Sequence, residues 1–111
     1  RAQRLVTPAI RTALVLRDRG CTFPGCNAPA SACHAHHLIP WWNGGKTALE
    51  NLALVCPHHH NLIEPTRDGP PGRRWELRIG ADGIPEVLPP DYYDPTRTPR
   101  RHQRFRYHDS G

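Results

Sequence analysis

The sequence predicts a small α+β domain that is stabilised by a bound metal ion. The chain has 111 residues, of which 37% are hydrophobic, so it can form one domain with a small core. Short apolar segments of strand length lie between segments with helical start signals. All four cysteines and six of the eight histidines fall between residues 21 and 60, a composition typical of metal ligands.

A helix is expected within the first segment, 1–20. Thr7 is a suitable N-cap, and Pro8 fits the first helical position, where a backbone N–H is not needed. Three apolar residues recur along one helical face: Ile10, Ala13 and Leu14. Gly20 is expected to end this helix.

Two strands are expected in the central segment, 21–66. The first covers residues 36–42 (HHLIPWW), with Pro40 marking a sheet edge or the end of the strand, because proline cannot donate to the ladder. The dipeptide Gly44-Gly45 after Asn43 is a strong turn signal. The second strand covers residues 51–56 (NLALVC).

A helix and then a hairpin are expected to follow these strands. The helix begins at Pro57 and ends before Pro65, which pushes the preceding residue out of the helical region. In segment 67–88, residues 75–79 alternate apolar and polar side chains, and residues 84–88 can return as a partner strand. We expect a β-hairpin at the periphery of the domain.

The last segment, 89–111, is rich in proline and arginine and is expected to be poorly ordered. Residues 97–111 hold five arginines and one aspartate, a net charge of +4, whereas the rest of the chain contributes +1 to the total of +5. Such an excess suits a polyanion such as nucleic acid, and it equally suits a solubilising, disordered end. Composition leaves both interpretations open.

The cysteines and histidines predict a structural zinc site. Because residues three apart share a helical face, Cys56 and His59 point in one direction and His60 in another. Cys21 and Cys26, brought alongside, would complete a Cys3His tetrahedron around Zn²⁺. Two disulfides are disfavoured by the intermixed histidines and by the absence of an export signal, and reduced thiols without a ligand are the other alternative. The energy of zinc binding would be folding energy.

Several nearby residues have simpler expected roles. Cys33 is expected to be a buried free thiol packed near the metal, although it could replace one of the other ligands. His34 and His58 are expected to face solvent or to support the ligands. Of Trp41 and Trp42, one is expected in the core, and the other could lie against a nucleic-acid groove.

Four motifs follow one another in a specific order. They are Cys21-x4-Cys26, Ala-His36-His37-Leu-Ile-Pro-Trp, Gly44-Gly45-Lys-Thr, and Asn51-Leu-Ala-Leu-Val-Cys56-x2-His59-His60. Over residues 21–64 the chain resembles the HNH endonuclease family, and it is particularly similar to HNH domains that end actinobacterial proteins with a large helical region upstream. The resemblance implies a ββα-metal fold, in which a hairpin and a helix hold one divalent cation (Mg²⁺, Mn²⁺, Ni²⁺ or Zn²⁺).

The resemblance also implies a role for each matching residue in phosphodiester hydrolysis. His36 matches a metal ligand, His37 the general base, Asn51 the central asparagine, and His60 the last metal-binding histidine. A neutral His37 can take a proton from water near neutral pH, and the cation would act as a Lewis acid. Asn51 would fix the loop that orients His37 rather than react itself. Where many relatives carry a further histidine, this chain has Glu64, which could be a ligand or a solvated surface acid.

One geometric condition accompanies these roles. Adjacent residues of a regular strand point to opposite faces, so His36 and His37 can share one site only if the strand is bulged or begins there.

The expected function is that of a metal-dependent endonuclease acting on DNA with little sequence specificity. The alternatives are a zinc-stabilised nucleic-acid-binding module without cleavage activity and a docking domain for an upstream region. The chain shows no signal peptide and no apolar run of membrane-spanning length, which predicts a cytoplasmic protein, and the resemblance implies a bacterial one. Since the sequence has no methionine, we expect a domain excised from a longer chain. The resemblance implies an upstream helical region of that chain as partner.

Overall fold

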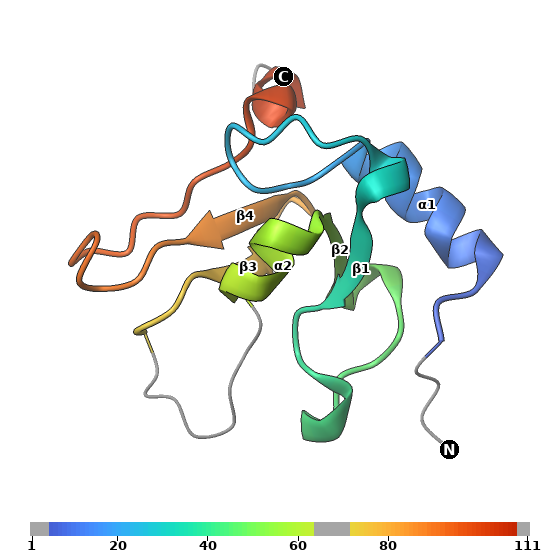
Figure 1. Cartoon of the computed structure of the whole chain (residues 1–111), viewed down its shortest axis with the longest axis horizontal. Helices are drawn as coiled ribbons and strands as arrows, with labels where there is room; N and C mark the ends of the chain where they lie inside the picture. The colour runs from blue at the N-terminus through green and yellow to red at the C-terminus, as the bar shows by residue number, and fades with distance from the viewer. Residues whose placement is uncertain (1–4, 64–71, 109–111) are drawn as a thin grey trace.

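The computed structural model describes residues 5–63 and 72–108 (Figure 1). The helices are α1 (Pro8–Asp18) and α2 (Pro57–Ile63), and the strands are β1 (His34–His37), β2 (Leu52–Val55), β3 (Glu76–Ile79) and β4 (Pro85–Leu88). The strands form two antiparallel sheets, β1-β2 and β3-β4. The fold is therefore α+β, as predicted. Among the described residues, no helix has both the length and the apolar character needed to cross a bilayer.

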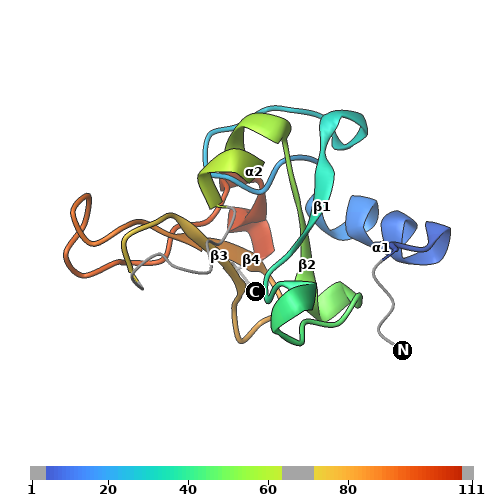
Figure 2. The same ribbon diagram turned by 60° about the horizontal axis from the view of Figure 1, so that its bottom comes forward.

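The β1-β2 sheet lies between the two helices. α1 packs against β2, and α2 packs against both strands (Figures 1 and 2). Because both sides of β2 are covered, every residue of this strand is buried. The centre of the core is formed by Leu14 of α1 together with Leu52, Leu54 and Val55 of β2, all fully buried. This arrangement places β1 and α2 side by side.

Helix α1 begins as predicted, but the residue that ends it lies one position before the predicted Gly20. Thr7 Oγ1 accepts a hydrogen bond from the N–H of Ile10 at 3.2 Å. The helix is terminated by Arg19, which takes the left-handed conformation with φ 62°, and not by Gly20. Gly20 has a different role, because a Cβ atom there would lie 2.6 Å from the carbonyl oxygen of Ala28. Two chain segments approach too closely at this point for a side chain.

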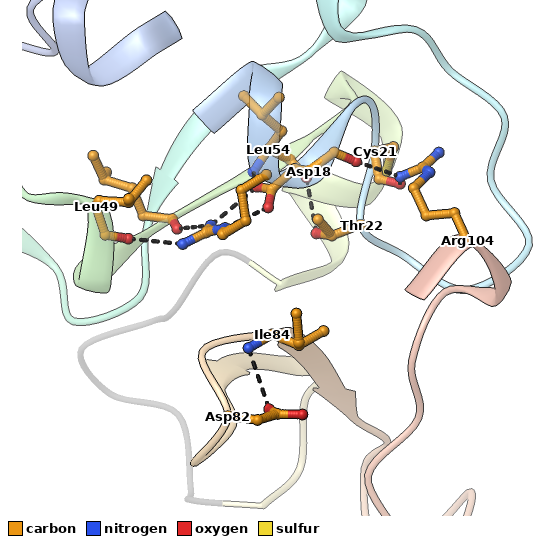
Figure 3. A network of polar contacts seen from close by, with 10 residues as sticks. Asp18, Cys21, Thr22, Leu49, Leu54, Asp82, Ile84 and Arg104 are labelled. Atoms are coloured by element: carbon orange, nitrogen blue, oxygen red, sulfur yellow. Dashed lines mark hydrogen bonds and ion pairs between the residues drawn. The ribbon is translucent and has the colours of Figure 1, made fainter. Parts of the chain in front are cut away.

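A buried carboxylate ties α1 to the sheet, a feature that the sequence did not reveal. Asp18 is fully buried and accepts hydrogen bonds from Arg17 Nε at 2.6 Å and from the N–H of Leu54 at 2.9 Å. Arg104, from the far end of the chain, donates to the carbonyls of Asp18 and Cys21 at 2.9 and 2.8 Å (Figure 3). Charge and hydrogen bonds are therefore satisfied at this junction, as burial requires.

The first strand begins and ends earlier in the chain than predicted. The expected strand over 36–42 is found at His34–His37, and Trp41–Asn43 form a short 3-10 helix. The carbonyl of Pro40 accepts a hydrogen bond from the N–H of Gly45 at 2.9 Å. The chain therefore turns at Pro40 instead of continuing along the sheet.

The remaining regular elements agree with the sequence-based expectations. β2 lies within the predicted 51–56 segment, and α2 begins at Pro57. Pro65, the expected end of that helix, lies outside the described residues. The β3-β4 hairpin forms as predicted and contributes Leu77 and Val87 to the main core.

The expectation that the last segment is poorly ordered was wrong for residues 89–105. Phe105 is fully buried, and His102 is 2% exposed. The backbone of Arg100 exchanges two hydrogen bonds with that of Val87, each 2.8 Å long. This segment therefore adds to the β4 edge and to the core, because its few apolar groups find partners far away in the sequence.

The arginines of this segment make ion pairs within the molecule. Arg97 contacts Glu76 at 2.6 Å. Arg101 contacts both Asp82 at 2.7 Å and Glu86 at 3.3 Å. These contacts favour a structural role for much of the basic excess.

Candidate metal centres

Four side chains that the sequence predicts as zinc ligands come together behind α2. One ligand atom from each of Cys21, Cys26, Cys56 and His59 lies within 4.8 Å of the others. Cys26 Sγ is 3.9 Å from Cys56 Sγ, and His59 Nδ1 is 3.2 Å from Cys56 Sγ and 3.6 Å from Cys21 Sγ. A zinc tetrahedron with Zn–S bonds of about 2.3 Å separates its sulfurs by about 3.8 Å. The cluster could therefore hold a four-coordinate ion such as zinc.

The chemistry of these thiols also fits a cation. Burial raises the pKa of Cys21 to about 12. Burial also acts to raise the pKa of Cys56, but hydrogen bonds from the backbone N–H of His59 and from the thiols of Cys26 and Cys21 bring it below its ordinary value. Without a metal ion, the protein therefore favours the thiolate of Cys56 and disfavours that of Cys21. A bound divalent cation would favour the thiolate form of all three cysteines in the cluster.

The ring of His59 is held in place by an aromatic neighbour. Phe23 stacks on it with ring centroids 4.0 Å apart and planes 7° from parallel. This contact orients Nδ1 toward the sulfurs. Sequence reasoning did not single out Phe23, since a phenylalanine between two cysteines is indistinguishable from an ordinary core residue.

Cys33 stays outside the cluster. It is buried and reduced, and its thiol donates to the carbonyl of Pro29 at 3.3 Å. Burial raises its pKa to about 11. This agrees with the prediction of a buried free thiol.

On the other side of α2, His60 meets the histidines of β1. Its ring centroid is 5.1 Å from that of His36 and 5.5 Å from that of His34. His36 is 5% exposed, and burial, with smaller effects of His60 and His37, lowers its pKa to about 4. His36 is therefore neutral at pH 7, the form in which imidazole binds metals. His34 was expected to face solvent or to support the ligands. It is exposed, and because it lies two residues before His36 in β1, both side chains point to the same face of the strand.

His37 is placed differently from its neighbour. The β1-β2 pairing runs regularly through His36↔Ala53 and His37↔Leu52, and the strand begins at His34. Neither condition for a shared face is met, so His36 and His37 alternate across the sheet. The Nε2 atom of His37 lies 2.9 Å from Thr47 Oγ1, and burial lowers the pKa of His37. His37 ends the strand as a neutral imidazole held by the following loop.

Asn51 fixes that loop, as the sequence suggested. Its Oδ1 accepts from the N–H of Ile39 at 2.9 Å, and its Nδ2 donates to the carbonyls of Ile39 at 3.0 Å and Lys46 at 2.8 Å. The loop is too tight for a side chain at Gly45, where a Cβ atom would be 1.7 Å from the carbonyl oxygen of Ile39. Asn51 and Gly45 thus set the conformation of the segment that carries Thr47.

Two expectations fall outside what the structure describes. Glu64, a predicted further ligand, lies outside the described residues, and so does the side chain of Trp41. Trp42 is half-buried.

The comparison with protein families agrees with this geometry. Residues 20–65 match the family described as HNH endonuclease, which nearly coincides with the span 21–64 expected from the motifs. This part of the chain belongs to the HNH endonuclease family. HNH nuclease domains act on DNA and use metal ions, so the class indicates a nuclease-type or nucleic-acid-binding function.

Several similar proteins come from mycobacteria. The uncharacterized protein Rv1148c of Mycobacterium tuberculosis and the uncharacterized protein Mb1179c of Mycobacterium bovis are each 38% identical to this chain over 92 residues. The uncharacterized protein Rv1128c of Mycobacterium tuberculosis is also 38% identical over 92 residues. These alignments cover 83% of the chain but only 18–19% of each relative, so the chain spans about a fifth of their length. No solved structure shows significant similarity.

Proposed function

We propose that this domain is a metal-dependent endonuclease that hydrolyses phosphodiester bonds of DNA. The observation that carries the proposal is that adjacent histidines of α2 serve two groups of side chains. His59 joins three cysteines, whereas His60 joins His36. A structural site and a reactive site can therefore share one short helix.

The first group would be the structural centre. Cys21, Cys26, Cys56 and His59 would hold Zn²⁺ with no open position. Such a centre would fix the loop before β1, which has little regular structure, to the beginning of α2. In a domain with a small core, this binding energy contributes directly to folding.

The second group would form the reaction site. His36 and His60 would hold the exchangeable cation through neutral imidazoles, with Glu64 as a further candidate ligand. That cation, when bound, supplies Lewis-acid stabilisation of the negative charge that develops on the phosphate and the leaving 3′ oxygen. The products expected from the family are 5′-phosphate and 3′-hydroxyl ends.

His37 would act as the general base from the opposite face of β1. It is the last residue of this strand and lies close enough to His36 to help lower the pKa of that ring, so it would reach the water from the end of the sheet. A base must be neutral, reachable by water and fixed in orientation. His37 is half-buried, its pKa is lowered by burial, and its ring is held by Thr47. If Nε2–H donates to Thr47 Oγ1, Nδ1 carries the lone pair and can accept a proton from the attacking water. Asn51 would position this base through the loop.

DNA would be bound with low sequence specificity. Both described α-helices pack against the central sheet, and α2 has only seven residues, which is short for reading bases in a groove. Without a helix suited to reading bases, contacts would be mainly with phosphates, and binding would weaken as salt rises. Arg97 and Arg101, which are paired with acidic side chains of the same molecule, would contribute less to this binding.

Plasmid nicking tests this proposal. Zinc-loaded protein is incubated with supercoiled DNA and added Mg²⁺, Mn²⁺ or Ni²⁺, and His37→Ala is compared with Tyr92→Ala, a change at an exposed side chain outside both groups. We expect cation-dependent nicking by the wild type and Tyr92→Ala. His37→Ala should lose about 100-fold or more in rate, a typical contribution of a general base, while keeping its zinc and its circular dichroism spectrum. DNA binding without nicking by the wild type would favour the zinc-stabilised binding module instead.

A further inference from the structure

The face of β1 that meets α2 carries two histidines rather than one. His34 and His36 are two residues apart, so their side chains point to the same side of the sheet. Both rings lie beside His60, with centroid separations of 5.5 and 5.1 Å. His36 is buried, whereas His34 is exposed and borders solvent.

These separations are suited to a shared metal ion. Two imidazoles that bind one ion tetrahedrally, with metal–nitrogen bonds of about 2.0–2.1 Å, have ring centroids about 5 Å apart. Both pairs that include His60 are close to this value. Because His34 is exposed, its ring can change rotamer to direct a nitrogen at the ion without displacing core residues.

We propose that His34 is the third protein ligand of the exchangeable cation, which makes this centre a three-imidazole site. The inference rests on the proposed cation site at His36 and His60 and adds the class of metal to it. Three neutral imidazoles suit Zn²⁺, Co²⁺ or Ni²⁺, whereas Mg²⁺ requires oxygen ligands. Three protein ligands also leave a fourth position for a phosphate oxygen or water. Such a centre needs no carboxylate from Glu64.

Cobalt titration tests the proposal without relying on activity. Protein with one zinc per chain is titrated with Co²⁺, followed by calorimetry and by visible absorption. Thiolate-to-cobalt charge-transfer absorption would reveal any Co²⁺ that had entered the cysteine site. The variants are His34→Ala, His36→Ala and the exposed control Tyr92→Ala.

We expect the wild type and Tyr92→Ala to bind one Co²⁺ through nitrogen and oxygen ligands only. Removal of a group that only supports a metal ligand lowers metal affinity by about 10–100-fold. Because His34→Ala removes a proposed ligand itself, it should weaken Co²⁺ binding by at least this factor. Excess Mg²⁺ should not displace Co²⁺. His34→Asp should restore a ligand of oxygen type and raise affinity for Mn²⁺ relative to Co²⁺.

The outcomes separate this inference from the proposed function. If His34→Ala binds Co²⁺ as the wild type does while His36→Ala does not, His34 is not a ligand, and the two-histidine site stands. If the zinc-loaded wild type nicks DNA with Mg²⁺ and binds no Co²⁺, the three-imidazole site is overturned although the nuclease remains. If the wild type binds Co²⁺, His34→Ala does not, and no added cation supports nicking by the wild type, the three-imidazole site stands although the proposed nuclease fails.

Discussion

The carboxamide of Asn51 closes a pair of hydrogen bonds with the main chain of Ile39. Oδ1 accepts from the N–H at 2.9 Å, and Nδ2 donates to the carbonyl at 3.0 Å. Asn51 therefore satisfies the backbone of the β1-β2 loop at a point where neither strand can. Asn51, the central asparagine of the motif, therefore has a structural role that does not require contact with substrate.

Asn51→Ala should lower the free energy of unfolding by about 2–4 kcal/mol, because it removes three hydrogen bonds and leaves buried loop groups without partners. Urea denaturation of the zinc-loaded protein measures this change. Asn27→Ala is a matched control, since Asn27 is exposed, and it should change stability by less than about 0.5 kcal/mol. Equal midpoints for the two variants would show that the Asn51 contacts do not hold the loop.

The cysteines should differ in their response to substitution. Cys56→Ser should remove most of the bound zinc and unfold the region around α2, since metal binding contributes to folding. Cys33→Ser should keep one zinc per chain and the wild-type circular dichroism spectrum, because Cys33 lies outside the four-residue cluster. Metal analysis after gel filtration measures the difference. Loss of zinc from Cys33→Ser alone would mean that the ligand set is wrong.

Thr47 should act as a positioning residue for His37. Thr47→Val keeps the shape of the side chain but removes the hydroxyl that lies 2.9 Å from Nε2. We expect nicking to slow by about 10–100-fold, a fraction of what a general base contributes, with Thr47→Ser close to the wild type. The ¹⁵N chemical shifts of His37 should show a change in tautomer in Thr47→Val and none in Thr47→Ser. Identical spectra and rates for the two variants would exclude this role.

His102 should make stability depend on pH. The N–H of Arg104 donates to Nδ1 at 3.1 Å, so Nε2 carries the hydrogen and donates to the carbonyl of Cys26 at 2.6 Å. Burial lowers the pKa of His102 in the folded chain. Below pH of about 6.5, the unfolded chain takes up a proton that the folded chain resists. Between pH of about 6.5 and the lowered pKa, the free energy of unfolding should therefore fall as pH decreases. Above pH of about 6.5, it should not depend on His102.

Replacement of this histidine provides the measurement. His102→Gln should reduce the pH slope of the unfolding free energy between pH 6.5 and 5 by up to about 1.4 kcal/mol per pH unit, the value for one proton. Asn27→Ala, at an exposed position without a titratable group, should keep the wild-type slope. All samples contain saturating zinc. If His102→Gln and the wild type have the same slope, His102 does not titrate as its contacts imply.

Local signals explain why some parts of the fold could be predicted. The cap at Thr7, the start of α2 at Pro57 and the shared face of Cys56 and His59 depend on residues within one or two helical turns. The course of residues 89–105 depends on contacts such as that between His102 and Cys26, which are 76 residues apart. Composition carries no record of such partners.

The candidate site was predictable to a similar extent. The resemblance identified His36 and His60, which the structure brings together. It did not indicate that the strand begins early enough to bring His34 to the same face, or that His37 would be engaged by Thr47. Both features depend on strand register and on the turn at Pro40. The apolar residues around Pro40 predicted a continuing strand, so the sequence did not indicate this turn.

The central claim is that α2 separates two metal centres, with His59 facing one and His60 the other. Native mass spectrometry of His59→Ala and His60→Ala, each with excess Zn²⁺ and Co²⁺, tests it most directly. We predict that His60→Ala stays folded with one tightly held zinc and loses only the exchangeable ion. We predict that His59→Ala loses the tight zinc and its folded charge-state distribution. If both variants lose the same ion, or if neither changes the metal content, α2 does not divide two centres.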